Sequence, residues 1–349
     1  MTASTSAGTT TVSLRDPGQL LAALPHLLGF RPADSVLVVA HGGRSGRRVG
    51  NVVRADLPRP DGVADLAQVL RASILAGDVA AATVAVVGGG KARGRAGPPW
   101  RDLVDAVAEA FAHAGHHVAH SLWVPEISAG ARWHCYHDPA CTGRMPDPAS
   151  SVMAAVAAHQ GMVTYPSREE MERQLAPADP AALARRSALL DAELEVLGAR
   201  SSPEQAREQG LARVRAALGK ALAGQLTFTD EEVAGLALAL SVPEVRDACL
   251  ATAVPTGESR ALAAERLWLA LVRETPAPER AQAACLLAYS AYVRGEGALA
   301  GMALENALTA HPGHVLAGLL HQALRHAVPP SRITGLGERG GEPSLWEPG

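Results

Sequence analysis

The chain has 349 residues, of which 48% are hydrophobic and only 3% aromatic, so its core must be built mainly from Ala, Leu and Val. The formal net charge of -3 argues against a general nucleic-acid-binding protein, because such domains are usually strongly basic. Four scattered cysteines exclude a disulfide framework, and no uncharged apolar run reaches the roughly 18 residues of a membrane helix. We therefore expect a cytoplasmic protein of about two domains that does not enter a membrane.

The first part of the chain predicts strands that alternate with helices. Residues 1–10 are rich in Ser, Thr and Gly and are expected to be disordered, and residues 11–14 can form a first strand. A helix should begin at Asp16, an N-cap followed by proline, and end at Gly29. The wholly apolar run Val36–Ala40 is typical of a strand that is buried on both faces.

Further strands are predicted at 35–40, 49–57, 82–87 and 117–124, with helices at 61–76 and 100–114. The connection between the strands 35–40 and 49–57 is short, so these two strands should form an antiparallel hairpin. A strand–helix–strand crossover normally joins parallel neighbours. We therefore expect 11–14 and 35–40 to be parallel neighbours and the next three strands to run the opposite way. The result is an α/β fold with a mixed sheet of five to six strands, flanked by helices, with the sixth strand at 162–164.

Composition changes at 177–180, and beyond this point the chain is almost entirely helical. We place an α/β domain at 11–176, a helical domain at 177–330 and a disordered tail, rich in Gly and Pro, at 331–349. The predicted helices are 181–199, 203–223, 230–241, 244–253, 258–274, 277–294, 297–310 and 314–326. The last four resemble the tetratricopeptide pattern of paired helices, with small residues where helices cross and proline between pairs.

Polar residues should converge at one edge of the sheet. With these strand directions, the turn before 35–40 lies at the edge where the next three strands end, and ligands of open α/β sheets bind at strand C-termini. The candidate ligand-binding residues there are Arg31, Asp34, Arg54, Asp56, Lys91 and Arg93. The alternative for Asp34, Arg54 and Asp56 is a salt-bridged cap that joins the turn to the hairpin. The alternative for the GGGKARGRAG segment is a solvated loop, because it matches neither phosphate-binding pattern.

Residues 130–148 show almost no periodicity and concentrate Trp, His, Tyr and Cys. His134, Cys135, His137 and Cys141 carry the donor atoms that zinc prefers. Five residues separate the two cysteines, more than is usual in zinc sites. A tight structural loop and a redox pair are therefore alternative interpretations, and apart from zinc no cofactor is predicted.

Several stretches together resemble one family. They are LLGFRPADSVLVV, RADLP, DPAC, SREEMERQLAP and LLAYSAYVRGEGALAGMALENAL, in this order, within residues 13–333. They resemble the actinobacterial family known as domain of unknown function four-one-nine-two. The resemblance places these residues on recurring motif positions: Gly29, Phe30, Arg31, Pro32, Asp34, Ser35, Asp56, Cys135, Asp138 and Cys141. In the family pattern the second cysteine is often doubled and followed by proline, whereas here Thr142 follows Cys141, which weakens the metal interpretation.

The family has no established activity, so the resemblance implies no catalytic residue. The leading hypothesis is a non-enzymatic cytoplasmic binding or regulatory protein, with an unidentified protein partner on the helical half, because no complete catalytic motif accompanies the repeat-like helices. The alternative is an enzyme or small-ligand-binding domain. Its site would lie at the sheet edge formed by the GFRPADS turn, the end of the RADLP strand and the Cys135–Cys141 loop.

Overall fold

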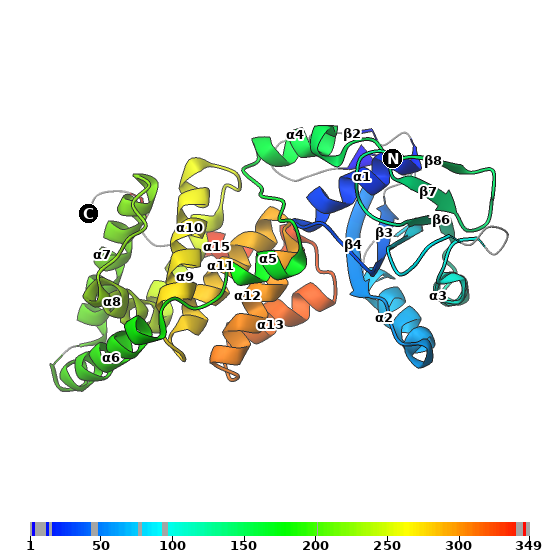
Figure 1. Cartoon of the computed structure of the whole chain (residues 1–349). Helices are drawn as coiled ribbons and strands as arrows, with labels where there is room; N and C mark the ends of the chain where they lie inside the picture. Colours follow the sequence, from blue (N-terminus) through cyan, green and yellow to red (C-terminus); the bar gives the residue numbers. More distant parts are fainter. Residues whose placement is uncertain are drawn as a thin grey trace. The chain divides into compact units, whose positions relative to one another are not determined.

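The computed structural model describes residues 2–3, 12–13, 16–42, 48–75, 79–92, 97–200, 202–339 and 345–346. The chain divides into two compact units. One comprises Met1–Glu170 with Arg325–Val328, and the other comprises Met171–Leu324 with Pro329–Gly349. The first unit holds a mixed sheet and the second is helical (Figure 1), which confirms the predicted fold class.

The α/β unit is built on a sheet with the strand order β2-β1-β4-β3-β5-β6-β7-β8. The strands are β1 (Thr2–Ala3), β2 (Val12–Ser13), β3 (Ser35–Gly42), β4 (Arg48–Asp56), β5 (Ala81–Val87), β6 (Val118–Val124), β7 (Arg132–Cys135) and β8 (Thr142–Arg144). Strand β3 is antiparallel to both of its neighbours, β4 and β5, whereas β5 and β6 are parallel. The antiparallel hairpin of β3 and β4 is as predicted.

Four details of the predicted sheet differ from the structure. Residues 132–135 and 142–144, for which no strand was predicted, form β7 and β8 and extend the sheet beyond β6. Strands β2 and β3 run in the same direction, but they are not neighbours, because β1 and β4 lie between them. Strand β1 itself falls in residues 1–10, which were predicted to be disordered, and it pairs with β2 and β4. Residues 162–164 form no strand. The hydroxyl of Thr164 instead hydrogen-bonds the buried ring of His26 at 2.9 Å.

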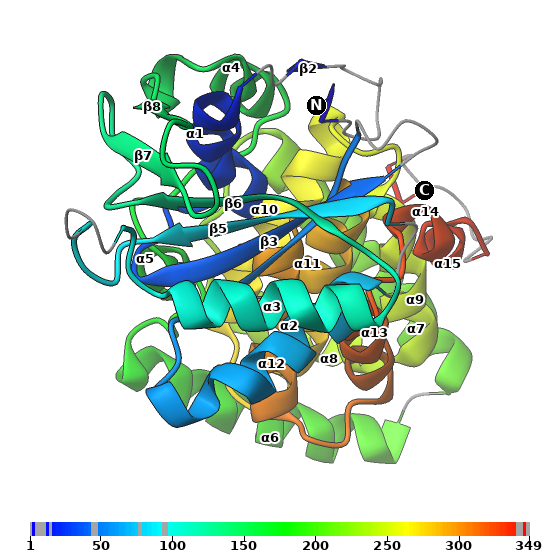
Figure 2. The same ribbon diagram turned by 90° about the vertical axis from the view of Figure 1, so that its right-hand side faces the viewer.

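Helices cover both faces of the sheet. Helix α1 (Pro17–Leu28) begins as predicted, with the Asp16 carboxylate accepting the Gln19 N–H at 2.9 Å, and ends at Gly29 with φ 80°. Helices α2 (Val63–Leu75) and α3 (Arg101–His113) bury their apolar sides against alternate residues of β3, β5 and β6. Figure 2 shows α1 on the opposite side of the sheet from α2 and α3.

Shorter helices complete this unit and lead into the next. They are η1 (Pro60–Gly62), η3 (Pro148–Ser150), α4 (Val152–His159) and α5 (Arg168–Arg173). The N–H of Glu170 donates to the Ser167 hydroxyl at 3.2 Å, so Ser167 caps α5.

The helical unit contains every helix that the sequence predicts between residues 181 and 326. They are α6 (Pro180–Arg200), α7 (Pro203–Leu222), α8 (Asp230–Ser241), α9 (Pro243–Leu250) with η4 (Ala251–Ala253), α10 (Ser259–Glu274), α11 (Arg280–Arg294), α12 (Gly297–Ala310) and α13 (Val315–Arg325). Trp268 of α10 and Tyr289 of α11 are among the largest fully buried side chains. Within the described residues, no helix combines the length and the apolar character needed to cross a bilayer.

Two more helices, α14 (Pro330–Ile333) and α15 (Gly335–Arg339), fall in the tail that was predicted to be disordered. The Tyr289 hydroxyl lies within 3.2 Å of the Ile333 carbonyl and accepts the N–H of Gly337 at 3.0 Å. A buried tyrosine from α11 therefore orders this segment, and its local composition gave no sign of that contact.

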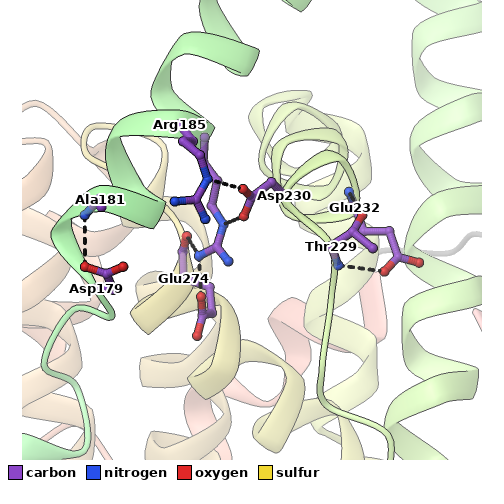
Figure 3. A network of polar contacts seen from close by, with 8 residues as sticks. Asp179, Ala181, Arg185, Thr229, Asp230, Glu232 and Glu274 are labelled. Carbon is purple, nitrogen blue, oxygen red and sulfur yellow. Dashed lines mark hydrogen bonds and ion pairs between the residues drawn. The ribbon is translucent and has the colours of Figure 1, made fainter.

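A buried arginine joins three helices of the helical unit, next to the contact between Arg185 and Asp230 that Figure 3 shows. The Arg186 side chain of α6 is 8% exposed, and its Nε donates to Asp230 Oδ1 of α8 at 2.8 Å. Its Nη1 donates to the Glu274 carbonyl at the end of α10, also at 2.8 Å, and contacts the Glu274 carboxylate. Arg185, which is 60% exposed, binds the other oxygen of Asp230. Because both carboxylates have an arginine partner, their burial between the helices is compensated.

Candidate functional site

The ends of β4, β5 and β6 meet the start of β3 at one edge of the sheet, as the predicted strand directions require. Ser35 of β3 pairs with both Asp56 of β4 and Val87 of β5, and Val87 pairs with Val124 of β6. We call this rim, made of residues 31–35, 54–57 and 87–91, the strand-exit edge. It is the position at which open α/β sheets usually bind ligands.

Asp34 joins the three segments of the strand-exit edge. Its Oδ1 accepts the N–H of Gly89 at 2.7 Å, and its carbonyl accepts the N–H of Leu57 at 3.1 Å. Asp34 has φ 39°, in the left-handed region that side chains other than Gly rarely adopt. Gly88 has φ 73°, and a Cβ atom there would overlap the Asp34 carboxylate. The glycines that follow β5 therefore allow a carboxylate to approach the backbone closely.

Two tryptophans fix the same glycine turn from the other side. Trp100 Nε1 donates to the carbonyl of Gly89 at 2.9 Å, and Trp123 Nε1 donates to that of Gly88, also at 2.9 Å. Trp100 has φ 65° and stands at the N-terminus of α3. Neither indole was predicted to lie at this site, because a Trp is usually assigned to the core. Their signal was the combination of a buried strand, three glycines and an aromatic residue before the next helix.

Arg54 and Asp56 lie on one face of β4 and form an ion pair with 2.6 Å between Nη2 and Oδ1. Arg54 Nε also donates to the Ser35 hydroxyl at 2.9 Å, and that hydroxyl contacts the Ala33 carbonyl. The Arg54 side chain is 14% exposed and that of Asp56 is 82% exposed. Arg54 therefore ties β4 to the turn before β3, as in the structural-cap alternative, whereas Asp34 bonds the glycine turn. Ligand binding by these residues stays a prediction.

The remaining cationic candidates are exposed. Arg31 donates its backbone N–H to the Tyr165 carbonyl at 3.0 Å, and its side chain lies at the surface. Lys91 is exposed immediately after the glycine turn. Arg93 lies outside the described residues. Arg31 and Lys91 thus place two positive charges on the strand-exit edge.

The Cys and His segment forms the outer hairpin of the sheet, β7 and β8. Cys135 pairs with Leu122, two residues inward from the end of β6, on a strand three places from β3. At about 4.8 Å per strand, it is separated from Ser35 by roughly 14 Å across the sheet. The cysteine pair is therefore not part of the strand-exit edge, and the alternative site comes together only in its first two segments.

The four zinc candidates occupy different positions on this hairpin. The His134 ring lies 5.9 Å from that of Trp123, and burial followed by the charge of Arg132 lowers its pKa. His137 is exposed in the hairpin loop. Among the described residues, which include all four candidates, no group of three or more His, Cys, Asp and Glu side chains is placed to hold a metal ion. The zinc site stays a prediction without geometric support.

A family model with the description Domain of unknown function (DUF4192) matches residues 17–331. The chain belongs to this family. The comparison with curated proteins finds no match, and neither does the comparison with solved structures. The family assignment predicted from five short motifs is confirmed, while the family description itself carries no activity.

Several motif positions of this DUF4192 chain have structural roles. Gly29 ends α1, Asp34 caps the glycine turn, and Ser35 connects Arg54 to the turn before β3. Cys135 and Cys141 close the β7–β8 hairpin through a backbone hydrogen bond of 2.9 Å. Each of these residues has a local structural role, so the motifs alone do not mark a catalytic site.

A second polar site of the DUF4192 chain lies inside the helical unit. Arg294 Nη2 donates to Glu265 Oε1 at 2.6 Å and to Glu296 Oε2 at 2.7 Å. Burial raises the pKa of Glu296 to about 7, against the opposing effect of Arg294. A cavity of about 10 Å³, room for one water molecule, adjoins Glu265, Ser290 and Arg294. No sequence signal predicted this cluster, because Glu265 is far from the other two residues along the chain.

Proposed function

We propose that this protein is a cytoplasmic binding or regulatory protein that recognises an amphipathic helix of a partner protein through its helical unit. The surface that we assign to the partner is the α13 face, made of Val315, Gly318 and Leu319. Val315 is 75% exposed and Leu319 is 58% exposed. Residues four apart lie one above the other on a helix, so these two side chains form one apolar patch.

Gly318 is the observation that carries the proposal. Glycine inside a helix costs about 1 kcal/mol relative to alanine. Among the described residues, and apart from its chain neighbours and the backbone of its own helix, no atom lies within 4 Å of the position that a Cβ of Gly318 would take. Gly301 of α12 is different, because its Cβ would lie 3.5 Å from the Leu324 side chain of α13. Packing between α12 and α13 thus explains Gly301, whereas a close-packed partner would explain Gly318.

The chemistry of the α13 face favours a helical partner. An apolar pair one turn apart beside a small residue is suited to the spaced apolar anchors of an amphipathic helix, with close backbone approach at the glycine. The tetratricopeptide-like pairing predicted for the last four helices supports the same role, since stacked helix pairs commonly provide such surfaces.

The experiment starts with a photo-crosslinking amino acid placed in the full-length protein at Val315. We expect it to capture one discrete protein, while the same group at Val69 of α2, which is 59% exposed in the α/β unit, does not capture it. The purified partner should then bind the Leu319→Asp variant at least tenfold more weakly, with the Val69→Asp variant unchanged. Equal capture from both positions, or wild-type affinity of Leu319→Asp, would refute the proposal.

Ligand binding or catalysis at the strand-exit edge is the second candidate function. Two residues other than glycine, Asp34 and Trp100, have left-handed backbone there, and strained conformations cluster at functional sites. The exposed cations Arg31 and Lys91 suit a small anionic ligand. A thermal-shift screen of small anions should then give a hit that Arg31→Ala and Lys91→Ala abolish, without any change in crosslinking at Val315.

A further inference from the structure

The two cysteines of the β7–β8 hairpin face one another. Trp133 lies opposite Gly143 and His134 opposite Thr142, so the next position along the ladder sets Cys135 opposite Cys141. The N–H of Cys135 donates to the carbonyl of Cys141 at 2.9 Å. Directly opposite residues of an antiparallel pair point to the same face, with Cβ atoms about 4.5 to 5.5 Å apart. This arrangement is close to the geometry that a disulfide needs.

The two cysteine side chains are neighbours and accessible. Cys135 is close enough to raise the pKa of Cys141, and both side chains are partly exposed. Partial burial, and then the neighbouring Cys135 and Asp138, raise the pKa of Cys141. The other two cysteines, Cys249 and Cys285, are fully buried. Only the hairpin pair therefore combines proximity with access to a reagent.

We propose that Cys135 and Cys141 form a reversible dithiol–disulfide pair that exchanges with the disulfide of an oxidised low-molecular-weight thiol. In the first step Cys135 loses its proton and attacks one sulfur of the reagent. The reagent's S–S bond breaks, and its other sulfur leaves and takes up a proton. Cys141 then loses its proton and attacks the Cys135 sulfur, which releases the second reagent thiol. Two electrons pass from the protein to the reagent, and one S–S bond is gained as one is lost.

Cys141 carries out the second step because it lies opposite Cys135, and attack within one molecule compensates for the thiolate fraction that its raised pKa removes. The closed ring would contain Tyr136, whose hydroxyl donates to the Pro99 carbonyl at 2.6 Å. The Tyr136 carbonyl accepts Nη2 of Arg101 at 2.7 Å. The oxidised hairpin would thus restrain a loop that already holds the start of α3.

The test treats the full-length protein with oxidised glutathione and measures free thiols, intact mass and melting temperature. We expect two of the four thiols to disappear, the mass to fall by two hydrogen atoms, and peptide mapping to find a bond between Cys135 and Cys141. Melting of the α/β unit should rise by about 5 °C, because the ring restricts the unfolded chain. Dithiothreitol should reverse every change.

Cysteine variants test whether the bond forms specifically between Cys135 and Cys141. Cys135→Ser and Cys141→Ser should each yield at most a glutathione adduct, with a mass increase and no ring. The Cys249→Ala and Cys285→Ala variants should close the ring as the wild type does. Four free thiols in excess oxidant, a stable adduct on the wild type, or a disulfide between two molecules would each overturn the proposal.

Discussion

Replacing Glu296 by Gln should stabilise the helical unit at high pH and remove a titration near neutral pH. Glu296 is 6% exposed, and it shares the guanidinium of Arg294 with Glu265, which is 16% exposed. Burial is the main cause that raises the Glu296 pKa, and the charge of Glu265 raises it further. The neutral carboxyl group is therefore favoured in the folded state.

The magnitude follows from the difference between the folded and unfolded pKa values. Raising the pKa from 4.5 to about 7 corresponds to about 3 kcal/mol, at ~1.4 kcal/mol per pKa unit. The pKa of Glu296 is higher in the folded state than in the unfolded chain, so binding a proton at Glu296 stabilises the folded state. This stabilisation is fully present below pH 4.5. It is lost as the pH rises through about 7. At pH 8 the folded state must bury a carboxylate that a Gln at the same position does not carry.

The assay is urea denaturation followed by far-ultraviolet circular dichroism between pH 5 and pH 8. The Glu296→Gln variant should exceed the wild type in free energy of unfolding by about 3 kcal/mol at pH 8, and this difference should fall to about 1 kcal/mol at pH 5. Glu305→Gln, an exposed substitution on α12, the helix that begins directly after Glu296, should leave the pH profile unchanged. A Glu296→Gln profile parallel to that of the wild type, or a less stable variant at pH 8, would refute the reasoning.

Other substitutions test other parts of the molecule. Gly88→Ala should lower the free energy of unfolding of the α/β unit by about 2 to 3 kcal/mol in urea denaturation, because its φ is 73° and the new Cβ would overlap a carboxylate. Gly115→Ala should cost only about 1 kcal/mol, because its φ is 77° but its new Cβ would meet no atom of the described residues within 4 Å beyond its chain neighbours. Arg186→Met should lower the free energy of unfolding of the helical unit by about 2 kcal/mol in urea denaturation, because it removes the hydrogen bonds of a buried guanidinium to Asp230 and to the Glu274 carbonyl, whereas Arg185→Met should cost less than ~1 kcal/mol. Burial lowers the pKa of His314, so the unfolded chain takes up the proton first and stability should fall as the pH drops below 6.5; in His314→Asn this acid-dependent loss in melting temperature should be smaller.

The local elements of this protein follow from short stretches of sequence. A carboxylate at Asp16 and a glycine at Gly29 delimit α1, and proline and glycine separate the helices of the second unit. The wholly apolar run Val36–Ala40 identifies β3 as a strand buried on both faces, and a short connection makes β3 and β4 a hairpin. These features depend on residues within a few positions of one another, so composition and spacing suffice to predict them.

The hairpin β7–β8 could not be predicted from local sequence patterns. Its strands have four and three residues, too few for an alternating pattern to be recognised. The contact of Tyr289 with α14 and α15 spans more than forty residues of sequence, so the tail gives no local sign of its order.

The candidate sites depended on tertiary structure in the same way. The strand directions that the sequence implied bring the strand-exit edge together, but only the folded chain pairs Asp34 with Gly89, 55 residues later, instead of with Arg54. Likewise Arg294 finds Glu265 on another helix, 29 residues away. Local backbone preferences determine where helices and strands begin and end. The packing of distant segments determines which polar groups must share a buried position, and a single sequence does not display those distances.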